Sequence, residues 1–467
     1  MISKKEDLEK LEDSKKGHAS TYSTRFFTEH VPKYEFPKQD MPANVALQLV
    51  RDELNLDGNP ALNLASFVTT WMEAEANELI IDNINKNLID QFQYPQTEEI
   101  QKRVVNMLAR LFNAPGEVNF AGTSTTGSSE ALMLGLLAHK WAWKKRRKTE
   151  GKPYDKPNII FGADGHICWD KFAKYFDVEP RIIPLETNRF VISPESVAKL
   201  IDENTICVGV ILGTTFTGDI DPVKEVNDLL VNIKNFEGWD IPIHVDAAIG
   251  GFVIPFTNPD FIWDFRLPHV KSINVSGHKY GLVYPGVGWL IFREFNNLPE
   301  DLIFYVNYLG NEFPTYTLNF SRGAAFVIAQ YYNLLRLGRK GYTNIATNTI
   351  ENARFLAKCL NKMGNFEMLN TANLLPIVTF KLKEPANYTL FDLSHKLRER
   401  GWIIPAYTLP PNADNITVIR VVVKENFSMD MADLLIEDIL NACEMLDGSK
   451  KVKNSPQRSP RKGHHIT

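Results

Sequence analysis

The sequence predicts an α/β fold, with a large doubly wound domain built on a mainly parallel sheet and a smaller α+β domain after it. The main observation is a series of short apolar runs, separated by helical stretches, in which polar residues do not alternate with apolar ones. Such runs are too short for buried helices and are typical of strands covered on both faces. They comprise residues 158–161, 181–184, 206–212, 241–245, 272–275 and 287–292. Doubly wound sheets bind ligands at the carboxyl ends of their strands, so polar residues that directly follow these runs are candidates for a site.

A second region follows a long helical pattern that begins near residue 331. It contains helices and two further strand-like runs, 375–382 and 416–423, which predict the separate α+β domain. The last residues are basic and poor in apolar side chains, as a mobile extension should be. We expect an N-terminal segment at 1–60, a large ligand-binding domain at 61–345, a small domain at 346–448 and a flexible basic tail at 449–467.

The length and charge of the chain limit the class of protein to which it can belong. A chain of 467 residues can bury cores for both domains without help from metals or disulfides. Its 52 basic and 56 acidic side chains give a formal charge of −4. This balance speaks against nucleic acid as the main partner and favours a small-molecule ligand.

The cysteines and the apolar segments indicate the compartment. Cys168, Cys207, Cys359 and Cys443 show no Cys-x-x-Cys spacing, which predicts core thiols in a reducing compartment rather than a disulfide framework or a zinc site. The N-terminus has no apolar signal core, and no later stretch approaches the roughly 18 uninterrupted apolar residues of a membrane span. We therefore expect a cytoplasmic protein without integral membrane association.

Two residues at predicted strand ends point to the chemistry. Asp246 directly follows the run 241–245, and Lys279 comes shortly after the run 272–275, within Ser-Gly-His-Lys-Tyr. A lysine amine can hold the aldehyde of pyridoxal phosphate as a Schiff base, and an aspartate can keep the pyridine nitrogen protonated so that the ring accepts electrons. A lone lysine after a strand is more often a solvated surface residue. Together the two residues predict a pyridoxal 5'-phosphate site.

A third motif fits the phosphate of that cofactor. Gly127, Ser128 and Ser129 come after a turn rich in Gly, Thr and Ser and open a predicted helix. Two hydroxyls and free backbone amides would then meet the positive end of a helix dipole. In isolation the motif would be read as an ordinary Ser N-cap. Beside a cofactor lysine it predicts a phosphate cradle, to which Ser276 would add a further hydroxyl.

Longer blocks of sequence resemble the glutamate decarboxylases of bacteria and plants, within the pyridoxal phosphate-dependent group II decarboxylases. The resemblance covers about residues 22 to 447. It includes residues 63–67, 85–87 with Asp90, 94–95, 127–131, 263–267, 276–280 and 319–321. It implies the pyridoxal phosphate-dependent transferase fold of the aspartate aminotransferase type (type I). It also implies conversion of L-glutamate to 4-aminobutanoate (GABA) and CO2 with uptake of a proton, and a homodimer as the minimal unit, with a hexamer as an alternative.

The resemblance assigns further cofactor contacts. His166 would stack on the cofactor ring, Thr215 would contact the cofactor, and Ser321 would reach its phosphate from the partner subunit. His166 departs from the pattern, because glutamate decarboxylases usually have Gln there and decarboxylases of aromatic amino acids have His. This departure keeps another amino acid open as the substrate.

The resemblance also assigns the substrate pocket. Ser66 and the backbone amide of Phe67 would bind the distal carboxylate of glutamate, with Asp90 of the neighbouring subunit as a further contact. Two carboxyl groups repel unless they share a proton, which would favour low pH. Arg420 would clamp the α-carboxylate with its planar fork. Even in a purely structural role, an arginine in this apolar strand is expected to need a carboxylate partner.

The implied reaction begins when glutamate displaces Lys279 from the cofactor. Carbon dioxide then leaves, and the electrons pass into the ring that Asp246 keeps protonated, through a quinonoid intermediate. The α-carbon is protonated by Tyr308 of a mobile loop or by His278, and either residue could equally be structural. A catalytically silent protein with a regulatory role remains a rival hypothesis, against which the intact Lys279, Asp246 and Ser128 argue.

The chain ends in a His pair near the terminal Thr. In the bacterial relatives, a C-terminal tail with such a His closes the active site near neutral pH. The match is incomplete, because an extra residue precedes the terminal Thr and such pairs are more often disordered or come from expression tags. Since imidazole titrates near pH 6.5, His465 or His464 would gate the site and activity would rise as the pH falls below neutral.

Overall fold

A computed structural model of the chain describes residues 33–116, 120–186, 188–310, 312–370 and 372–448. The chain divides into two compact units, and the division falls between Asn59 and Pro60 in the sequence. The described part of the first unit contains one helix, α2 (Ala43–Leu54). The predicted tail at 449–467, with His464 and His465, lies outside the described residues.

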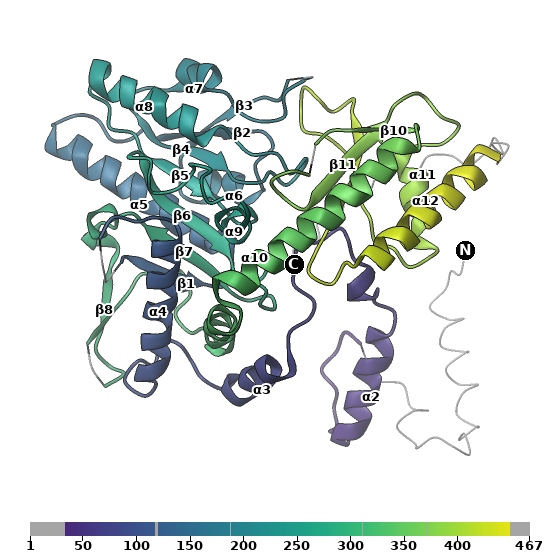
Figure 1. The fold of residues 1–467 in the computed structure, drawn as a ribbon. Helices are drawn as coiled ribbons and strands as arrows, with labels where there is room; N and C mark the ends of the chain where they lie inside the picture. Colours follow the sequence, from purple (N-terminus) through teal and green to yellow (C-terminus); the bar gives the residue numbers. More distant parts are fainter. Residues whose placement is uncertain (1–32, 117–119, 187, 311, 371, 449–467) are drawn as a thin grey trace. The chain divides into compact units, whose positions relative to one another are not determined.

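The second unit is built on a seven-stranded sheet with the order β1-β7-β6-β5-β4-β2-β3 (Figure 1). The pairs from β3 through β6 are parallel, whereas β7 pairs antiparallel with β6 and β1. The mainly parallel α/β sheet confirms the predicted fold class. The strands are β1 (Gly122–Thr125), β2 (Asn158–Gly162), β3 (Glu179–Ile183), β4 (Thr205–Ile211), β5 (Ile243–Asp246), β6 (Val270–Ser276) and β7 (Gly288–Phe292).

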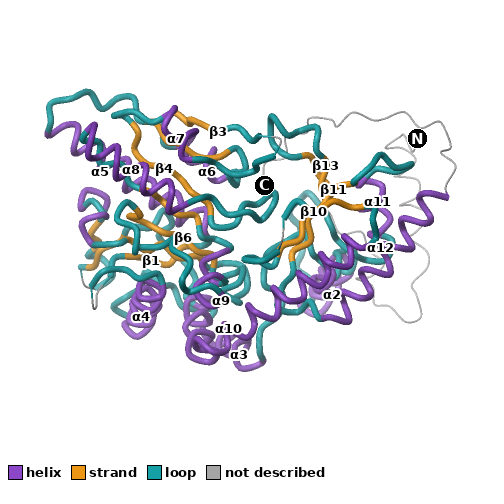
Figure 2. The backbone as a smooth tube through the Cα atoms, turned by 45° about the horizontal axis from the view of Figure 1, so that its top comes forward, coloured by secondary structure: helices purple, strands orange, loops and turns teal. Residues whose placement is uncertain are grey.

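Helices cover both faces of this sheet, which explains the uninterrupted apolar runs. Helix α5 (Ser128–Thr149) and helix α6 (Cys168–Tyr175) share one set of core contacts, on the opposite side of the strands from α4 (Pro95–Leu111) (Figure 2). The other helices of this part are α3 (Ala74–Asn83), α7 (Pro194–Leu200), α8 (Val223–Glu237) and α9 (Ile254–Thr257). Within the described residues, no helix has the length and apolarity needed to cross a membrane.

Three segments differ from the sequence prediction. The Gly/Thr/Ser-rich stretch before the cradle is strand β1 rather than a turn, because it pairs with β7 along its whole length. Strand β3 lies at the sheet edge and exposes most of its side chains, so it is not covered on both faces as expected. A short hairpin of β8 (Phe304–Val306) and β9 (Phe313–Thr315) has no counterpart in the prediction.

The C-terminal part is an antiparallel four-stranded sheet with the order β10-β11-β13-β12. Helix α10 (Ala325–Lys362) runs from the large sheet to this one and is non-helical at Gly338 (Figure 1). It passes through residue 345, where we expect the domain boundary, which stays a prediction. The remaining elements are β10 (Phe366–Met368), β11 (Ile377–Leu382), α11 (Leu390–Arg398), β12 (Ala406–Thr408), β13 (Thr417–Val422) and α12 (Met429–Gly448).

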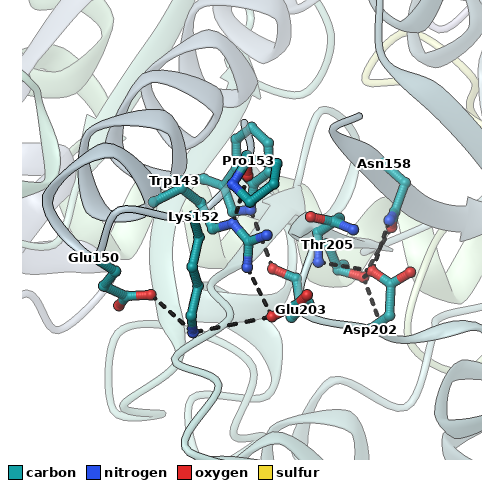
Figure 3. A network of polar contacts seen from close by, with 10 residues as sticks. Trp143, Glu150, Lys152, Pro153, Asn158, Asp202, Glu203 and Thr205 are labelled. Carbon is teal, nitrogen blue, oxygen red and sulfur yellow. Dashed lines mark hydrogen bonds and ion pairs between the residues drawn. The ribbon is translucent and has the colours of Figure 1, made fainter. Parts of the chain in front are cut away.

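A polar network ties the amino ends of β2 and β4 together (Figure 3). The buried Asn158 side chain donates to Asp202 over 2.8 Å and accepts from the Thr205 hydroxyl over 2.8 Å. Nearby, Arg147 of α5 is buried and pairs with Glu203 at 2.8 Å. Because the strands are parallel, this network lies at the opposite end of the sheet from the residues that follow the strands.

Candidate active site

Most of the predicted cofactor residues, all except Ser276 and Ser321, line one cavity at the carboxyl ends of β4 and β5. It has a volume of about 130 Å³. A larger cavity of about 630 Å³, against α4 and β1, is lined by none of the predicted site residues. The predicted residues that line the smaller cavity are Ser128, Ser129, His166, Thr215, Asp246, His278 and Lys279.

Lys279 lies in the turn that follows β6. Its Nζ is 5.3 Å from the centroid of the Phe67 ring, and within the described residues it makes no hydrogen bond or ion pair. Burial lowers the pKa of Lys279, while the charge of Asp246 acts in the opposite direction. A lowered pKa favours the neutral amine, which is the nucleophilic form.

Asp246 is the last residue of β5 and is buried. Its Oδ1 accepts hydrogen bonds from Asn274 Nδ2 at 2.9 Å and from the Ala248 amide at 3.2 Å. No described residue donates to Oδ2, although the side chain lines the cavity. One carboxylate oxygen is therefore fixed by the protein and the other remains available to a cationic N–H such as a pyridinium.

The predicted cradle is present at the start of α5. The N-cap is Gly127 and no side chain caps the helix, so Ser128 is not an ordinary Ser N-cap. Ser128 Oγ lies 2.6 Å from Ser276 Oγ, which brings the two hydroxyls to one point. A Cβ at Gly288 would lie 2.4 Å from the Gly127 carbonyl carbon, so only glycine lets β7 approach the cradle this closely. Clustered hydroxyls at a helix N-terminus suit a phosphate.

His166 and His278 lie at the cavity wall. Burial lowers the pKa of both imidazoles, and the charge of Lys279 lowers that of His278 further. His278 Nδ1 lies 3.0 Å from the Val287 carbonyl oxygen, to which it donates. His278 Nε2 is therefore the nitrogen left to exchange a proton with a ligand.

Three of the predicted substrate residues, Ser66, Phe67 and Arg420, form a wall beside Lys279, outside the lining of the cavity itself. The Phe67 ring lies 4.7 Å from the Arg420 guanidinium carbon, as well as beside Lys279. Ser66 Oγ accepts from the Val68 amide at 3.2 Å, and its own hydroxyl proton remains free to donate. Within the described residues, the Phe67 amide donates to no protein group. This wall offers one hydroxyl, one amide and one guanidinium to an anionic ligand.

Arg420 corrects one expectation. It is buried, but its described partners are the carbonyl oxygens of Ala65 (2.6 Å) and Thr215 and the rings of Phe67 and Tyr407, not a carboxylate. Carbonyl dipoles and ring faces replace the expected ion pair. Burial lowers the pKa of Arg420, and its Nε is buried without a partner. Within the described residues no carboxylate pairs with Arg420, so its charge remains available to an anionic ligand.

Asp90, Ser321 and Tyr308 do not line this cavity. Ser321 Oγ accepts from Asn87 Nδ2 at 3.3 Å, on a segment that pairs with the one before Asp90. Tyr308 is 72% exposed, and its ring stacks on Phe320 with 6.2 Å between centroids. Within one chain, these three predicted residues form a separate group.

Some site residues were missed by the sequence prediction. Cys168 lines the cavity, and a buried polar chain through Asn274 and His244 supports Asp246 from behind. The signal was present, because the two runs that form β5 and β6 do alternate polar with apolar residues, contrary to our prediction: His244 and Asp246 lie two apart on β5, as Ser272 and Asn274 do on β6. Polar residues two apart on an apolar strand share one face and indicate a buried network.

The geometry fits pyridoxal phosphate, with a lysine amine, a carboxylate oxygen and a hydroxyl cradle around one cavity. Residues 37–383 match the family model described as the pyridoxal-dependent decarboxylase conserved domain. A glutamate decarboxylase of Solanum lycopersicum is 50% identical over 98% of this chain and 90% of its own length. One of Aliivibrio fischeri is 48% identical over 91% of this chain and 92% of its own. The solved structure of Lactobacillus brevis glutamate decarboxylase matches with a TM-score of 0.89 and 43% identity, over 92% of this chain and 98% of that one.

Proposed function

The chain belongs to the pyridoxal-dependent decarboxylase family, and from this premise we propose that it converts L-glutamate to 4-aminobutanoate (GABA) and CO2 with pyridoxal 5'-phosphate. The observation that carries the proposal is the cavity in which Lys279, Asp246 and the cradle at Ser128 meet. Relatives named glutamate decarboxylase, 43–52% identical over most of the chain, support the choice of substrate.

The cofactor, when bound, supplies an electron sink for the carbon that loses CO2. Lys279 holds its aldehyde, because the burial that lowers the pKa of the amine keeps that amine nucleophilic. Asp246 Oδ2 keeps the proton on the pyridine nitrogen. The hydroxyls of Ser128, Ser129 and Ser276 and the amides at the start of α5 hold the phosphate, while His166 and Thr215 contact the cofactor from the other walls.

Substrate selection follows from the wall beside Lys279. Arg420 binds the α-carboxylate and orients the bond that breaks, since its charge is not compensated by any described carboxylate. Ser66 and the Phe67 amide donate to the distal carboxylate. The distal group is what separates glutamate from substrates that lack a second acid.

Proton delivery has two candidates. His278 lines the cavity, and its Nε2 is free because Nδ1 donates to Val287. Tyr308 is highly exposed and lies outside the cavity of its own chain. His278 is in place within one chain, whereas Tyr308 would need a loop movement or another chain.

The minimal unit is a homodimer in which Asp90 and Ser321 complete the site of the other subunit. This assignment is supported by their position away from the cavity of their own chain and by exposed apolar side chains around them. The largest of these are Phe92, Phe304, Tyr305, Tyr308 and Leu318. Several large exposed apolar side chains on neighbouring segments are typical of an interface.

We place the enzyme in the cytoplasm. All four cysteines are free thiols, and three of them are buried. This fits a reducing compartment.

His166 supports a second candidate, a decarboxylase of another amino acid. The imidazole keeps the stacking role but occurs at this place in decarboxylases of aromatic amino acids. The donors at Ser66 and Phe67 would then have no partner on the substrate, which disfavours this candidate.

Product analysis tests the proposal. Purified protein loaded with pyridoxal phosphate and given L-glutamate should release CO2 and form GABA in equal amounts. Borohydride reduction followed by peptide mapping should place the pyridoxyl label on Lys279. Lys279→Ala should abolish both results, whereas the matched Lys271→Ala change on β6 should leave them intact. A label on another lysine, or an absence of GABA, would overturn the assignment.

A further inference from the structure

A continuous chain of buried polar side chains runs from α5 through β6 and β5 to Asp246. His139 Nε2 lies 2.7 Å from Ser272 Oγ, which lies 2.6 Å from His244 Nδ1. His244 Nε2 lies 2.7 Å from Asn274 Oδ1, and Asn274 Nδ2 lies 2.9 Å from Asp246 Oδ1. The parallel register builds this chain, because it places His244 opposite Ser272 and Asp246 opposite Asn274.

Every proton in this series of hydrogen bonds has one possible position. Asn274 donates its amide N–H to Asp246, so its Oδ1 must accept from His244 Nε2. Burial lowers the pKa of His244 to about 4 and that of His139 to about 3, so both rings are neutral near pH 6 and each carries one N–H. His244 Nδ1 therefore accepts from the Ser272 hydroxyl, and Ser272 in turn accepts from His139 Nε2–H. All donors point toward Asp246.

The surrounding packing is shaped around the central ring of this chain. A Cβ at Gly135 would lie 2.8 Å from His244 Cε1, so glycine at this place on α5 leaves the space that the imidazole occupies. Trp169 of α6 also packs against this ring, edge-on to His244 with 5.9 Å between the ring centroids. His139, Ser272, His244 and Asn274 are all buried, so neither ring can exchange its partner for water.

We infer that His139, Ser272 and His244 are positioning residues that act through Asn274 on Asp246. They hold the Asp246 side chain with Oδ1 saturated by two hydrogen bonds and Oδ2 turned to the cofactor nitrogen. The inference rests on the proposed function, which places the pyridine nitrogen at Asp246. Aligned hydrogen bonds polarise one another, so each remote link strengthens the last one. The protonation of the cofactor nitrogen is therefore sensitive to a hydroxyl that touches neither cofactor nor substrate.

Ser272→Ala is the most direct test. Without this hydroxyl, His244 Nδ1 loses its donor, and the ring can take the tautomer that carries its proton on Nδ1. His244 Nε2 then no longer donates to Asn274 Oδ1, so Asn274 is no longer forced to turn its N–H toward Asp246. Protein loaded with cofactor that is ¹⁵N-labelled at the pyridine nitrogen reports the result by NMR. The resonance should move toward the position of the unprotonated nitrogen, and kcat should fall about 2- to 10-fold with KM unchanged.

Thr205→Val is the matched control, because it removes an equally buried hydroxyl from β4 of the same sheet that has no link to Asp246. Its resonance and kcat should stay at the values of the unaltered protein. An unshifted resonance in Ser272→Ala, or equal shifts in both variants, would overturn the inference.

His139, at the end of the hydrogen-bond series farthest from Asp246, gives a second test. His139→Leu removes the donor to Ser272 and should move the ¹⁵N resonance in the same direction as Ser272→Ala, whereas His139→Gln keeps an N–H donor and should restore it. Identical spectra for the two variants would contradict the inference. The ¹⁵N readout needs no turnover, so loss of the proposed function would appear separately, as a lack of GABA from the unaltered protein.

Discussion

Asp246 and Lys279 are far apart in the sequence but lie in one cavity, because adjacent parallel strands end at the same edge of the sheet. Asp246 and Lys279 could be predicted from the sequence, because each comes shortly after a buried run.

The partners of Arg420 could not be predicted from the sequence. A buried arginine predicts some compensation, but whether that comes from a carboxylate or from carbonyl oxygens depends on the loop at Ala65, which packs against β13 only in the folded chain.

Asp246→Asn should keep the cofactor bound and lower kcat by roughly 100-fold or more, because an amide does not hold a proton on the pyridine nitrogen. Absorbance of the bound cofactor and steady-state kinetics measure the two effects. Asp240→Asn is the control, because it makes the same change just before the amino end of β5. Near-normal turnover in Asp246→Asn would remove the assigned role.

Arg420→Lys should lower kcat/KM for glutamate by about 10- to 100-fold, because an ammonium cannot bind Ala65 O, Thr215 O and a carboxylate with one planar fork. The exposed Arg400→Lys change should have no effect. If Arg420→Lys retained full kcat/KM, the α-carboxylate would have to be bound elsewhere.

At the scale of elements, the parallel strands could be predicted and the antiparallel ones mostly could not. Strands β2 and β4 are mostly apolar because helices cover both faces, whereas β5 and β6 are also buried but carry polar residues two apart. Strand β1 consists of Gly, Thr and Ser, and only its pairing with β7 makes it a strand. Such pairing joins distant parts of the chain and leaves no local pattern in the sequence.

The network at the amino ends of β2 and β4 gives an element-scale prediction (Figure 3). Asn158→Leu removes its hydrogen bonds to Asp202 and Thr205 and should lower the free energy of unfolding by about 1–3 kcal/mol. Urea denaturation measures the loss. Because the network lies at the far end of the sheet, KM for glutamate should not change, and a raised KM would show that the two ends are coupled.

At the scale of the whole molecule, the sequence resemblance placed Asp90 and Ser321 at the site, yet one chain does not bring them there. Neither periodicity nor strand ends carry information about a second chain. The homodimer proposed above accounts for their position, because its subunits would share sites.

Mixing two inactive variants tests shared sites. Lys279→Ala and Asp90→Ala, unfolded together and refolded, should regain roughly a quarter of the activity, because half of the random dimers contain one intact site of two. The same variants refolded separately and then combined without exchange are the control. A mixture no more active than its parts would mean that each chain contains a complete site.

We propose that this site selects an amino acid with a distal carboxylate. The most direct measurement is kcat/KM for CO2 release from L-glutamate, L-aspartate, L-tyrosine and L-DOPA by the purified, cofactor-loaded protein. Donors at Ser66 and Phe67 are left unpaired by an aromatic side chain and out of reach of the shorter acid, so glutamate should be preferred by up to roughly 10⁴. Faster CO2 release from tyrosine or DOPA than from glutamate would contradict this selectivity and would make His166 the better guide to the substrate.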